Sequence, residues 1–227
     1  MHAIILDTET HTLNGLPIEI AYAPIQLEAG QLSLDKSQTF DQLYQVDEPI
    51  SYAAMAVHHI LESDLVDQPH YTSFRLPSET IYMIGHNIDY DIEAIKRCGV
   101  DTSHIKAICT LALARLVWPD AEAHNISALI YMITKGSEKA RTMIKKAHRA
   151  DMDIILTANI LMHLVHHLKV QNLEELYEKS QQARIPKTIN FGKHRGTLIA
   201  DLPQDYVQWL LGKADLDPYL RQALETL

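Results

Sequence analysis

The stretch Ala3-Ile4-Ile5-Leu6-Asp7-Thr8-Glu9-Thr10 joins a run of apolar residues to a pair of carboxylates. Residues 3–9 are rich in β-forming side chains and are expected to form a strand. Because successive side chains of a strand point to opposite faces, Asp7 and Glu9 project from the same face while Thr8 points into the opposite layer. Two hard oxygen ligands side by side suit Mg²⁺ or Mn²⁺. The same pairing is common at solvated strand ends, so the prediction of a metal site depends on what the rest of the chain supplies.

The segments after this strand alternate between β-forming and helical patterns, with strands gathered early and helices late. The Asn14-Gly15 pair predicts a turn that joins the first strand to a second strand paired with it. This arrangement predicts an α/β fold with a central mixed sheet flanked by helices. The expected strands cover residues 18–26, 32–43, 80–84 and 105–109, and the expected helices run from a Ser51 cap to His58 and over residues 88–98, 110–117, 125–134 and 137–146.

A long helix is predicted from an apolar stripe near residue 160. Asp151 is well placed to cap this helix, which would put Asp153 in its first turn and leave His148 on the loop before it. On one continuous helix, a separation of five positions would point His148 and Asp153 apart. The stripe recurs at steps of four and three, typical of a helix packed on a sheet, and consists of Ile154, Ala158, Leu161, Val165 and Leu168.

Two segments place acidic residues near predicted helix starts. In Gly85-His86-Asn87-Ile88-Asp89-Tyr90-Asp91, Asn87 is the expected cap, and the two acids lie about 200° apart around the helix axis. Only one of them can face the sheet, and we assign Asp91 to that position and Asp89 to the positive end of the helix. The segment 148–153 adds a fourth carboxylate and a titratable base. Because clustered carboxylates repel one another, their convergence predicts a pair of divalent cations.

These motifs together resemble those of the DEDDh 3'-to-5' exonucleases, a family named for four acids and a histidine. Asp7-Thr8-Glu9-Thr10 resembles the first motif, His86-Asn87-x-x-x-Asp91 the second, and His148-x-x-x-x-Asp153 the third. They occur in the family's order, over about residues 1–168. One departure is His11-Thr12-Leu13 after the first motif, where relatives usually have Thr-Gly-Leu, and another is Cys109, where many relatives have Asp.

The resemblance implies a ribonuclease H-like fold and hydrolysis of phosphodiester bonds with two Mg²⁺ ions, for which Mn²⁺ can substitute. His148 would take a proton from the attacking water, since imidazole titrates near neutral pH. The product would be a nucleoside 5'-monophosphate. The expected metal ligands are Asp7, Glu9, Asp91 and Asp153, and the residues expected to line the terminal nucleotide are Thr8, His58 and Asn87.

The character of the chain changes after Leu168. We expect an exonuclease domain over residues 1–168, a linker and polar helix over 169–185, and a small C-terminal module over 186–227, which resembles a module of some bacterial members of the family that act on DNA. Phe191-Gly192-Lys193-His194-Arg195-Gly196 could grip a nucleic-acid backbone and stack a base. For Trp209 we favour a place in the core of the module.

Composition limits the classes of function. The net charge of −9 argues against a protein that coats nucleic acid through a broad basic surface. A local basic stretch between Lys135 and Arg149 leads into His148, and it is either a phosphate-binding segment or a solvated helix face. No apolar run is long enough for a signal peptide or a membrane span, so a cytoplasmic protein without membrane contact is expected. Cys98 and Cys109 are expected to be reduced core residues.

Three functions are compatible with these patterns. The first is a 3'-to-5' exonuclease acting on DNA, with a role in DNA repair or recombination. The second is an exoribonuclease with the same site, because no residue here decides recognition of the 2'-hydroxyl. The third is a non-catalytic protein that binds nucleic acid or a partner, which four converging carboxylates disfavour because they repel phosphate. Nucleic acid is the expected partner, DNA more than RNA, and the oligomeric state is left open.

Overall fold

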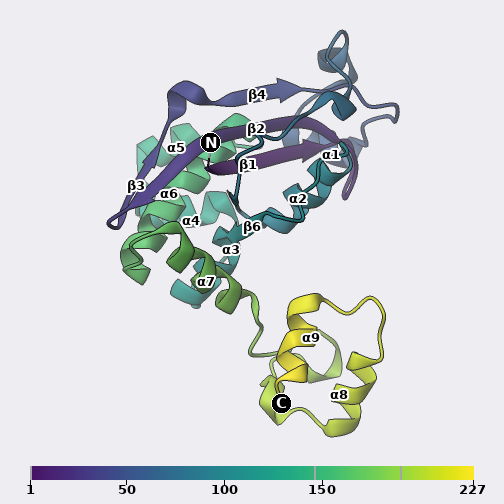
Figure 1. Ribbon diagram of the computed structural model, residues 1–227, viewed down its shortest axis with the longest axis vertical. Coiled ribbons are helices and arrows are strands. Elements are labelled where there is room, and N and C mark those ends of the chain that lie inside the picture. Colours follow the sequence, from purple (N-terminus) through teal and green to yellow (C-terminus); the bar gives the residue numbers. More distant parts are fainter. Residues whose placement is uncertain (1, 146, 190) are drawn as a thin grey trace. The chain divides into compact units, whose positions relative to one another are not determined.

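The computed structural model describes residues 2–145, 147–189 and 191–227, and the chain divides into two compact units, Met1–Ser180 and Gln181–Leu227 (Figure 1). The strands are β1 (Ala3–Thr10), β2 (Pro17–Glu28), β3 (Gln31–Leu34), β4 (Phe40–Leu43), β5 (Tyr82–Gly85) and β6 (Lys106–Cys109). The helices are α1 (Tyr52–His58), α2 (Ile88–Lys96), α3 (Thr110–Val117), α4 (Ile126–Ile133), α5 (Glu138–Ile144), α6 (Ala150–Leu168), α7 (Leu173–Arg184), α8 (Gln204–Leu211) and α9 (Pro218–Glu225). The predicted end of the fifth helix at Lys146 lies outside the described residues.

A mixed sheet is the centre of the first unit. Among the described residues its strand order is β3-β2-β1-β5-β6, and β4 also pairs with β2. β1 runs antiparallel to β2 and parallel to β5, and β5 runs parallel to β6. Helix α2 contacts β1, β5 and β6, while α6 contacts β1 and β2. The α/β fold with a mixed sheet flanked by helices, predicted from the sequence, is confirmed.

The expected third strand over residues 32–43 is wrong in one respect, because two short strands replace it. Asp35 accepts hydrogen bonds from the Ser37 backbone N–H at 3.0 Å and the Ser37 hydroxyl at 2.6 Å, which stabilises a turn between β3 and β4. Both strands pair with β2, which is 12 residues long. Its first half pairs with β4 from Glu19 to Tyr22 and its second half with β3 from Ile25 to Glu28.

Gly85 allows the start of α2 to lie close to β1. A Cβ atom at this position would lie 3.0 Å from the backbone oxygen of Leu6 and 2.7 Å from Cδ1 of Ile88. Real Cβ contacts are rarely this short, so the close packing requires a residue without a side chain. The consequence is that the first turn of α2, which contains Asp91, lies next to the carboxylate-bearing end of β1.

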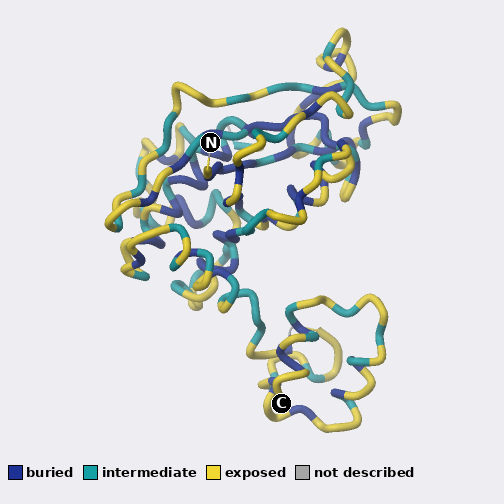
Figure 2. Tube along the Cα trace, viewed as in Figure 1, coloured by how far each residue is buried: buried dark blue, intermediate teal, exposed yellow. Residues whose placement is uncertain are grey.

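Helix α6 has the long apolar stripe expected from its sequence. Ile154, Leu161 and Val165 are buried against the sheet, whereas Met162 remains 48% exposed. Figure 2 shows this alternation of buried and exposed positions along the helix and the buried path of the central strands. Burial of such apolar surface stabilises the fold by about 25 cal/mol per Å². The stripe therefore fixes α6 against β1 and β2.

The second unit has a hydrophobic core of its own. Ile185, Tyr206, Leu211 and Leu216 pack around the edge of this core. Its buried members all come from one short segment and are Ile189, Ile199, Leu202, Val207, Leu210, Leu220, Ala223 and Leu224. Trp209 is not among them, because it is 54% exposed, so the core position favoured from the sequence is wrong. Helix α8 turns one face to the core, and Trp209 lies on the other face.

Two expectations about the chain's environment concern features outside the site. Cys98 and Cys109 are buried free thiols, as expected for reduced core residues. Burial raises the pKa of the Cys98 thiol to about 12. Within the described residues, no helix combines the length and the apolar character needed to cross a membrane.

Candidate active site

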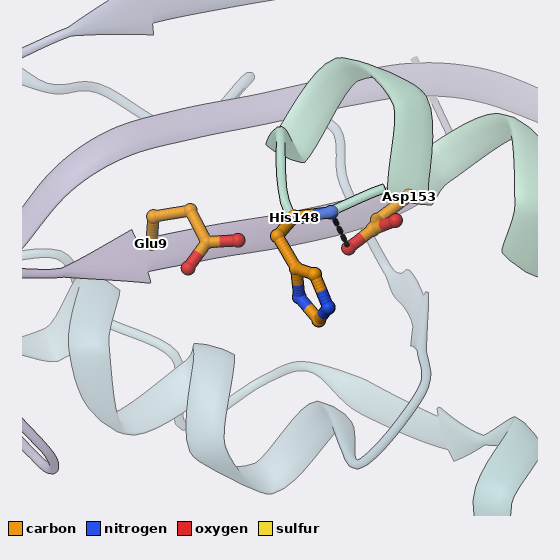
Figure 3. Close-up of side chains that lie close together, drawn as sticks. All are labelled: Glu9, His148 and Asp153. Carbon is orange, nitrogen blue, oxygen red and sulfur yellow. Dashed lines mark hydrogen bonds between the residues drawn. The ribbon is translucent and has the colours of Figure 1, made fainter. Parts of the chain in front are cut away.

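Side chains from two distant parts of the sequence meet at the end of β1 (Figure 3). Glu9 comes from β1, Asp153 from the first turn of α6, and His148 from the loop before that helix. One possible ligand atom from each residue lies within 4.8 Å of the others, so this trio could hold a metal ion. The Asp153 carboxylate accepts a hydrogen bond from the His148 backbone N–H at 3.2 Å, which ties the loop to the helix. The structure thus brings together three of the five residues that were assigned to the site from the sequence.

The backbone of His148 adopts the left-handed conformation, with φ of 65°. This region is uncommon for residues other than glycine and costs free energy that surrounding contacts must offset. The imidazole is exposed, whereas Asp153 is 6% exposed. The turn therefore presents the histidine at the surface of the site while the carboxylate stays beneath it.

Asp91 lies at the start of α2 and is 4% exposed. One of its carboxylate oxygens accepts hydrogen bonds from the Thr8 backbone N–H at 3.0 Å and from the Thr8 hydroxyl at 2.8 Å. These bonds join α2 to β1 between Asp7 and Glu9. Both bonds go to the same oxygen, so they fix the position of Asp91 through one side of its carboxylate.

The carboxylates are close enough to raise one another's pKa. Burial raises the pKa of Asp7 well above its ordinary value, and the charges of Asp91, Asp153 and Glu9 raise it further. Burial also raises the pKa of Glu9 to about 9, and the charges of Asp153 and Glu19 add to that rise. The four acids assigned from the sequence therefore form one electrostatic cluster.

Two members of the cluster are shifted less because their surroundings favour the charged form. Burial raises the pKa of Asp91 to about 7 against the opposing effect of the hydrogen bonds from Thr8. Burial raises the pKa of Asp153 to about 6 against the opposing effect of His148. Such a cluster is costly for the protein alone, and a bound cation would offset the cost.

The donor set fits a hard divalent cation. One oxygen of Asp153 is buried and has no hydrogen-bond partner among the described residues, which is uncommon for a buried carboxylate. Carboxylate oxygens that repel one another and are incompletely hydrogen-bonded suit the oxygen-rich coordination of Mg²⁺ or Mn²⁺. The site is thus electrostatically incomplete without positive charge.

We expect the metal-free protein to lose stability as the pH rises. The raised pKa values mean that the folded state binds more protons at these carboxyls than the unfolded state, so the stability that they contribute is fully present below about pH 4 and is lost as the pH rises through about 6 to 9. One pKa unit corresponds to about 1.4 kcal/mol, so the transition of the first unit should shift by at least about 5 °C.

Scanning calorimetry in EDTA at pH 5 and pH 8.5 measures this shift. Addition of Mg²⁺ at pH 8.5 should recover most of the lost stability, because an ion that binds the folded state stabilises it. Glu9→Gln should flatten the pH dependence. An equal loss in the wild type and in Glu9→Gln would show that the cluster is not its cause.

Glu19 is a residue of the site whose role the sequence did not reveal. It is fully buried on β2 and lies directly opposite Glu9 in the antiparallel register. Its carboxylate accepts hydrogen bonds from Arg149 Nε at 2.9 Å and from the Ala150 backbone N–H at 3.0 Å. The expected cap of this helix, Asp151, is wrong, because α6 begins at Ala150 and the Glu19 carboxylate on β2 accepts from the Ala150 N–H.

Glu19→Gln should therefore disturb the segment 148–153. An amide has one acceptor oxygen, so it cannot serve both Arg149 and Ala150, and a buried donor would face another donor. We expect turnover to fall about 10- to 100-fold, as for other residues that orient metal ligands, and unfolding free energy to fall by about 1–3 kcal/mol. Steady-state kinetics and urea unfolding measure both.

Asp151→Asn is the matched control for Glu19→Gln. It removes a carboxylate from the same helix turn without breaking either of those hydrogen bonds, and it should change stability by no more than about 1 kcal/mol. If the two variants behaved alike, Glu19 would have no special role in anchoring α6.

The three residues expected to line the terminal nucleotide lie in different environments. Thr8 is 5% exposed, and its hydroxyl is bonded to Asp91. His58 is 2% exposed, its Nδ1 accepts a hydrogen bond from the Ile60 backbone N–H at 2.9 Å, and burial lowers its pKa. Asn87 is exposed and occupies the cap position of α2 in the left-handed conformation, without the capping hydrogen bond expected from the sequence. Only Asn87 thus presents its side chain freely to solvent.

A surface cavity of about 440 Å³ lies beside the loop that contains His148. Lys145 and Arg149 are exposed residues of its lining, and His58 is a buried one. The expected basic stretch thus contributes two cations to the lining of this cavity. Lys146, also part of that stretch, lies outside the described residues.

The exonuclease family model RNase_T matches residues 4–161, which include the whole acidic cluster. The chain therefore belongs to this exonuclease family, and it is an exonuclease. The exodeoxyribonuclease 10 of Escherichia coli strain K12 is 28% identical over 97% of this chain and 96% of its own length. The 3'-5' exonuclease DinG of Staphylococcus aureus strain MRSA252 is 26% identical over 55% of this chain and 14% of its own length.

Solved structures confirm the ribonuclease H-like exonuclease fold. Exonuclease X, solved in complex with 5' overhanging duplex DNA, has a TM-score of 0.60 and 26% identity, covering 78% of this chain and 99% of that one. Escherichia coli exonuclease I, solved with a dA16 oligonucleotide, has a TM-score of 0.58 at 14% identity, covering 95% of this chain and 60% of that one, and shows the fold alone. A second family model, described as a putative quorum-sensing-regulated virulence factor, matches residues 181–221.

Proposed function

We propose that this exonuclease hydrolyses DNA from its 3' end and releases nucleoside 5'-monophosphates. The observation that supports this most strongly is the convergence of Glu9, His148 and Asp153 with Asp7 and Asp91 in one electrostatic cluster. A protein that only bound a polynucleotide would gain nothing from carboxylates that repel phosphate. With cations bound, the same residues form a site for phosphodiester hydrolysis.

The acidic residues would hold two divalent cations, Mg²⁺ in the first place and Mn²⁺ as a substitute. When bound, such ions lower the pKa of water and stabilise charge on the leaving oxygen. Thr8 holds Asp91 in position through two hydrogen bonds, and the His148 backbone N–H holds Asp153. The buried face of the site thereby fixes the carboxylates before substrate arrives.

His148 would accept the proton of the attacking water. Its imidazole is exposed at the mouth of the cluster, within reach of the carboxylates of Glu9 and Asp153. A general base must lie within hydrogen-bonding reach of the water that it activates, and the loop geometry places it next to the acids that would bind the cations. The neighbouring backbone N–H of Ala150 is bonded to Glu19, which holds the start of α6 fixed behind the loop.

The substrate end would lie against the cavity beside His148. Lys145 and Arg149 line it and would contact phosphate, while Thr8, His58 and Asn87 would surround the terminal nucleotide. The burial of Thr8 and His58 makes shape, rather than direct hydrogen bonding, their main contribution. DNA as the substrate rests on the likeness to exodeoxyribonuclease 10 and to exonuclease X solved with DNA. A role in DNA repair or recombination and a cytoplasmic location are part of this proposal.

Digestion of labelled oligonucleotides tests the proposal. A 5'-labelled single-stranded DNA incubated with protein and Mg²⁺ should give a ladder of products shortened from the 3' end, and EDTA should abolish it. The RNA of the same sequence is the matched substrate for the rival exoribonuclease activity. Faster digestion of the RNA would overturn the DNA assignment. A 3'-labelled strand whose label stays in long fragments and is not released as a mononucleotide would overturn the 3'-to-5' direction.

A further inference from the structure

We propose that an aromatic and basic surface of the second unit binds single-stranded nucleic acid, with Trp209 as the ring on which a base stacks. The surface consists of Phe191, Lys193, His194, Arg195, Tyr206, Trp209 and Lys213. It lies outside the cluster of acids and rests on the proposed function only for the choice of ligand. The features that support it are two exposed rings, Phe191 and Trp209, a lysine over the second of them, and a turn that contains two glycines.

Three rings of this unit lie in a row, of which two are stacked. The rings of Tyr206 and Trp209 are stacked, with centroids 5.4 Å apart and an interplanar angle of 25°, and the ring of His194 lies tilted against Tyr206, with centroids 4.4 Å apart and an angle of 51°. Trp209 lies at the end of this row and is 54% exposed. Trp209 is not a member of the buried core of this unit, so burial in that core does not explain its position.

The turn before the stack is built to present its side chains. Gly192 has φ of 63° and Gly196 has φ of 86°, both in the left-handed region that favours glycine. A Cβ at Gly196 would meet no atom within 4 Å, so backbone conformation rather than space selects glycine there. The Gly196 N–H donates to the Ile189 oxygen at 2.7 Å, which closes the loop. Between the two glycines, the chain exposes Lys193 and Arg195 on either side of His194.

The charge of this surface suits a polyanion. The segment 181–227 contains six Lys and Arg against five Asp and Glu, a net charge of +1. Because the whole chain has a net charge of −9, residues 1–180 have a net charge of −10. Three of the six cations, Lys193, Arg195 and Lys213, belong to the surface. Asp205 precedes Tyr206 in the sequence, and its carboxylate accepts a hydrogen bond from the Tyr206 backbone N–H at 2.9 Å. Rings interleaved with cations are the arrangement that binds single strands without sequence preference.

Lys213 shows how the surface would accept a base. Its ammonium lies 4.1 Å from the centroid of the Trp209 ring, so it covers one face of the indole through a cation–π contact. Its side chain is long and flexible, whereas the ring is fixed by Tyr206. An incoming base would replace the ammonium on the indole, and Lys213 would then be free to contact the adjacent phosphate.

Binding of the full-length protein to a labelled strand tests this inference. The probe is a fluorescein-labelled oligothymidylate of about 20 nucleotides, longer than the sites of about 4–16 nucleotides typical of such surfaces, and EDTA prevents digestion. Fluorescence anisotropy should show that Trp209→Ala weakens affinity by about 5- to 150-fold, the equivalent of one lost stacking contact. Trp209→Phe should retain most of the affinity, because a ring remains.

Two further variants identify the contribution of charge and exclude a general surface effect. Lys213→Gln should reduce the slope of log affinity against log salt by about 0.7, the value for one phosphate contact on a single strand. Met162→Ala removes an apolar residue of similar exposure from α6 in the other unit and should leave affinity unchanged. Equal effects of Met162→Ala and Trp209→Ala would overturn the inference.

Tryptophan fluorescence gives a direct readout of stacking. The chain has two tryptophans, so Trp118→Phe leaves Trp209 as the only one. Addition of oligothymidylate to that variant should quench its emission, with saturation at the concentration found by anisotropy. Binding without quenching would overturn the assignment of Trp209 as the stacking ring. Absence of oligothymidylate binding would overturn the assignment of a nucleic-acid surface.

The outcome is separable from that of the proposed function. If the wild type digests DNA and the Trp209→Ala variant binds oligothymidylate as well as the wild type does, this surface is refuted and the catalytic proposal is left intact. If the Trp209→Ala variant loses oligothymidylate binding and the wild type digests no nucleic acid with Mg²⁺, the catalytic proposal is refuted and this surface is left intact.

Discussion

Replacing Asp153 with asparagine is expected to lower 3'-end digestion of DNA by at least about 10³-fold, because stabilisation by a bound cation is worth several kcal/mol and each 1.4 kcal/mol is tenfold in rate. The amide keeps the size of the side chain and can still accept the His148 backbone N–H. It removes one negative charge from the cluster, so the affinity for Mg²⁺ should fall as well. Single-turnover digestion at saturating Mg²⁺ measures the loss of rate.

The same variant should be at least as stable as the wild type when metal is absent. Asp153 raises the pKa of both Asp7 and Glu9 through its charge, so its neutralisation relieves repulsion inside the folded protein. Activity and stability are therefore expected to move in opposite directions at pH 8. Asp151→Asn, the same substitution two residues earlier, is the control and should keep its activity. A large loss of activity in both variants would show that the effect is not specific to the cluster.

Replacing His148 with alanine is expected to lower turnover by about 10²- to 10⁴-fold, the usual contribution of a general base. The imidazole is exposed and the backbone N–H bond to Asp153 does not depend on the side chain, so the free energy of unfolding should be unchanged. The acidic limb of the pH–rate profile should flatten, because the base that it reports is gone. Turnover against pH, with calorimetry on the same sample, separates this result from loss of fold.

A role of His148 as a metal ligand makes a different prediction. The residue lies within ligand distance of Glu9 and Asp153, so removal of a ligand would weaken Mg²⁺ binding and high Mg²⁺ would rescue turnover. Removal of a base would leave the affinity for Mg²⁺ close to that of the wild type and would not be rescued. Isothermal titration with Mg²⁺ distinguishes the two roles, and rescue by excess cation would contradict the assignment of His148 as the base.

Much of the site could be predicted because its residues lie in locally recognisable segments. The alternation of β1 places Asp7 and Glu9 on one face, and the apolar stripe of α6 places Asp153 at its start. Residue spacing within one element is enough for both predictions. The convergence itself needed three motifs in the order of a known family, since no local rule brings residues 7, 91 and 153 together.

The predictions that were wrong concern contacts made across the fold. Asp151 is a good cap by residue type, but Glu19, which is 131 positions before Ala150, satisfies the helix start instead. Asn87 has the right position, yet its left-handed backbone removes the expected capping bond. Trp209 has the size of a core residue, but the aliphatic residues of its own unit fill that core first. Local preference does not reveal which distant group occupies a place.

The separate core of the second unit also affects how the molecule melts. Because Ile189, Leu210 and Leu224 belong to a core formed by residues of this unit, we expect the unit to have its own cooperative transition. A single midpoint would then not describe the whole chain, and heat that disorders one unit would leave the other folded. Partial denaturation would thus leave either a folded exonuclease unit with an unfolded second unit, or a folded second unit with an unfolded exonuclease unit.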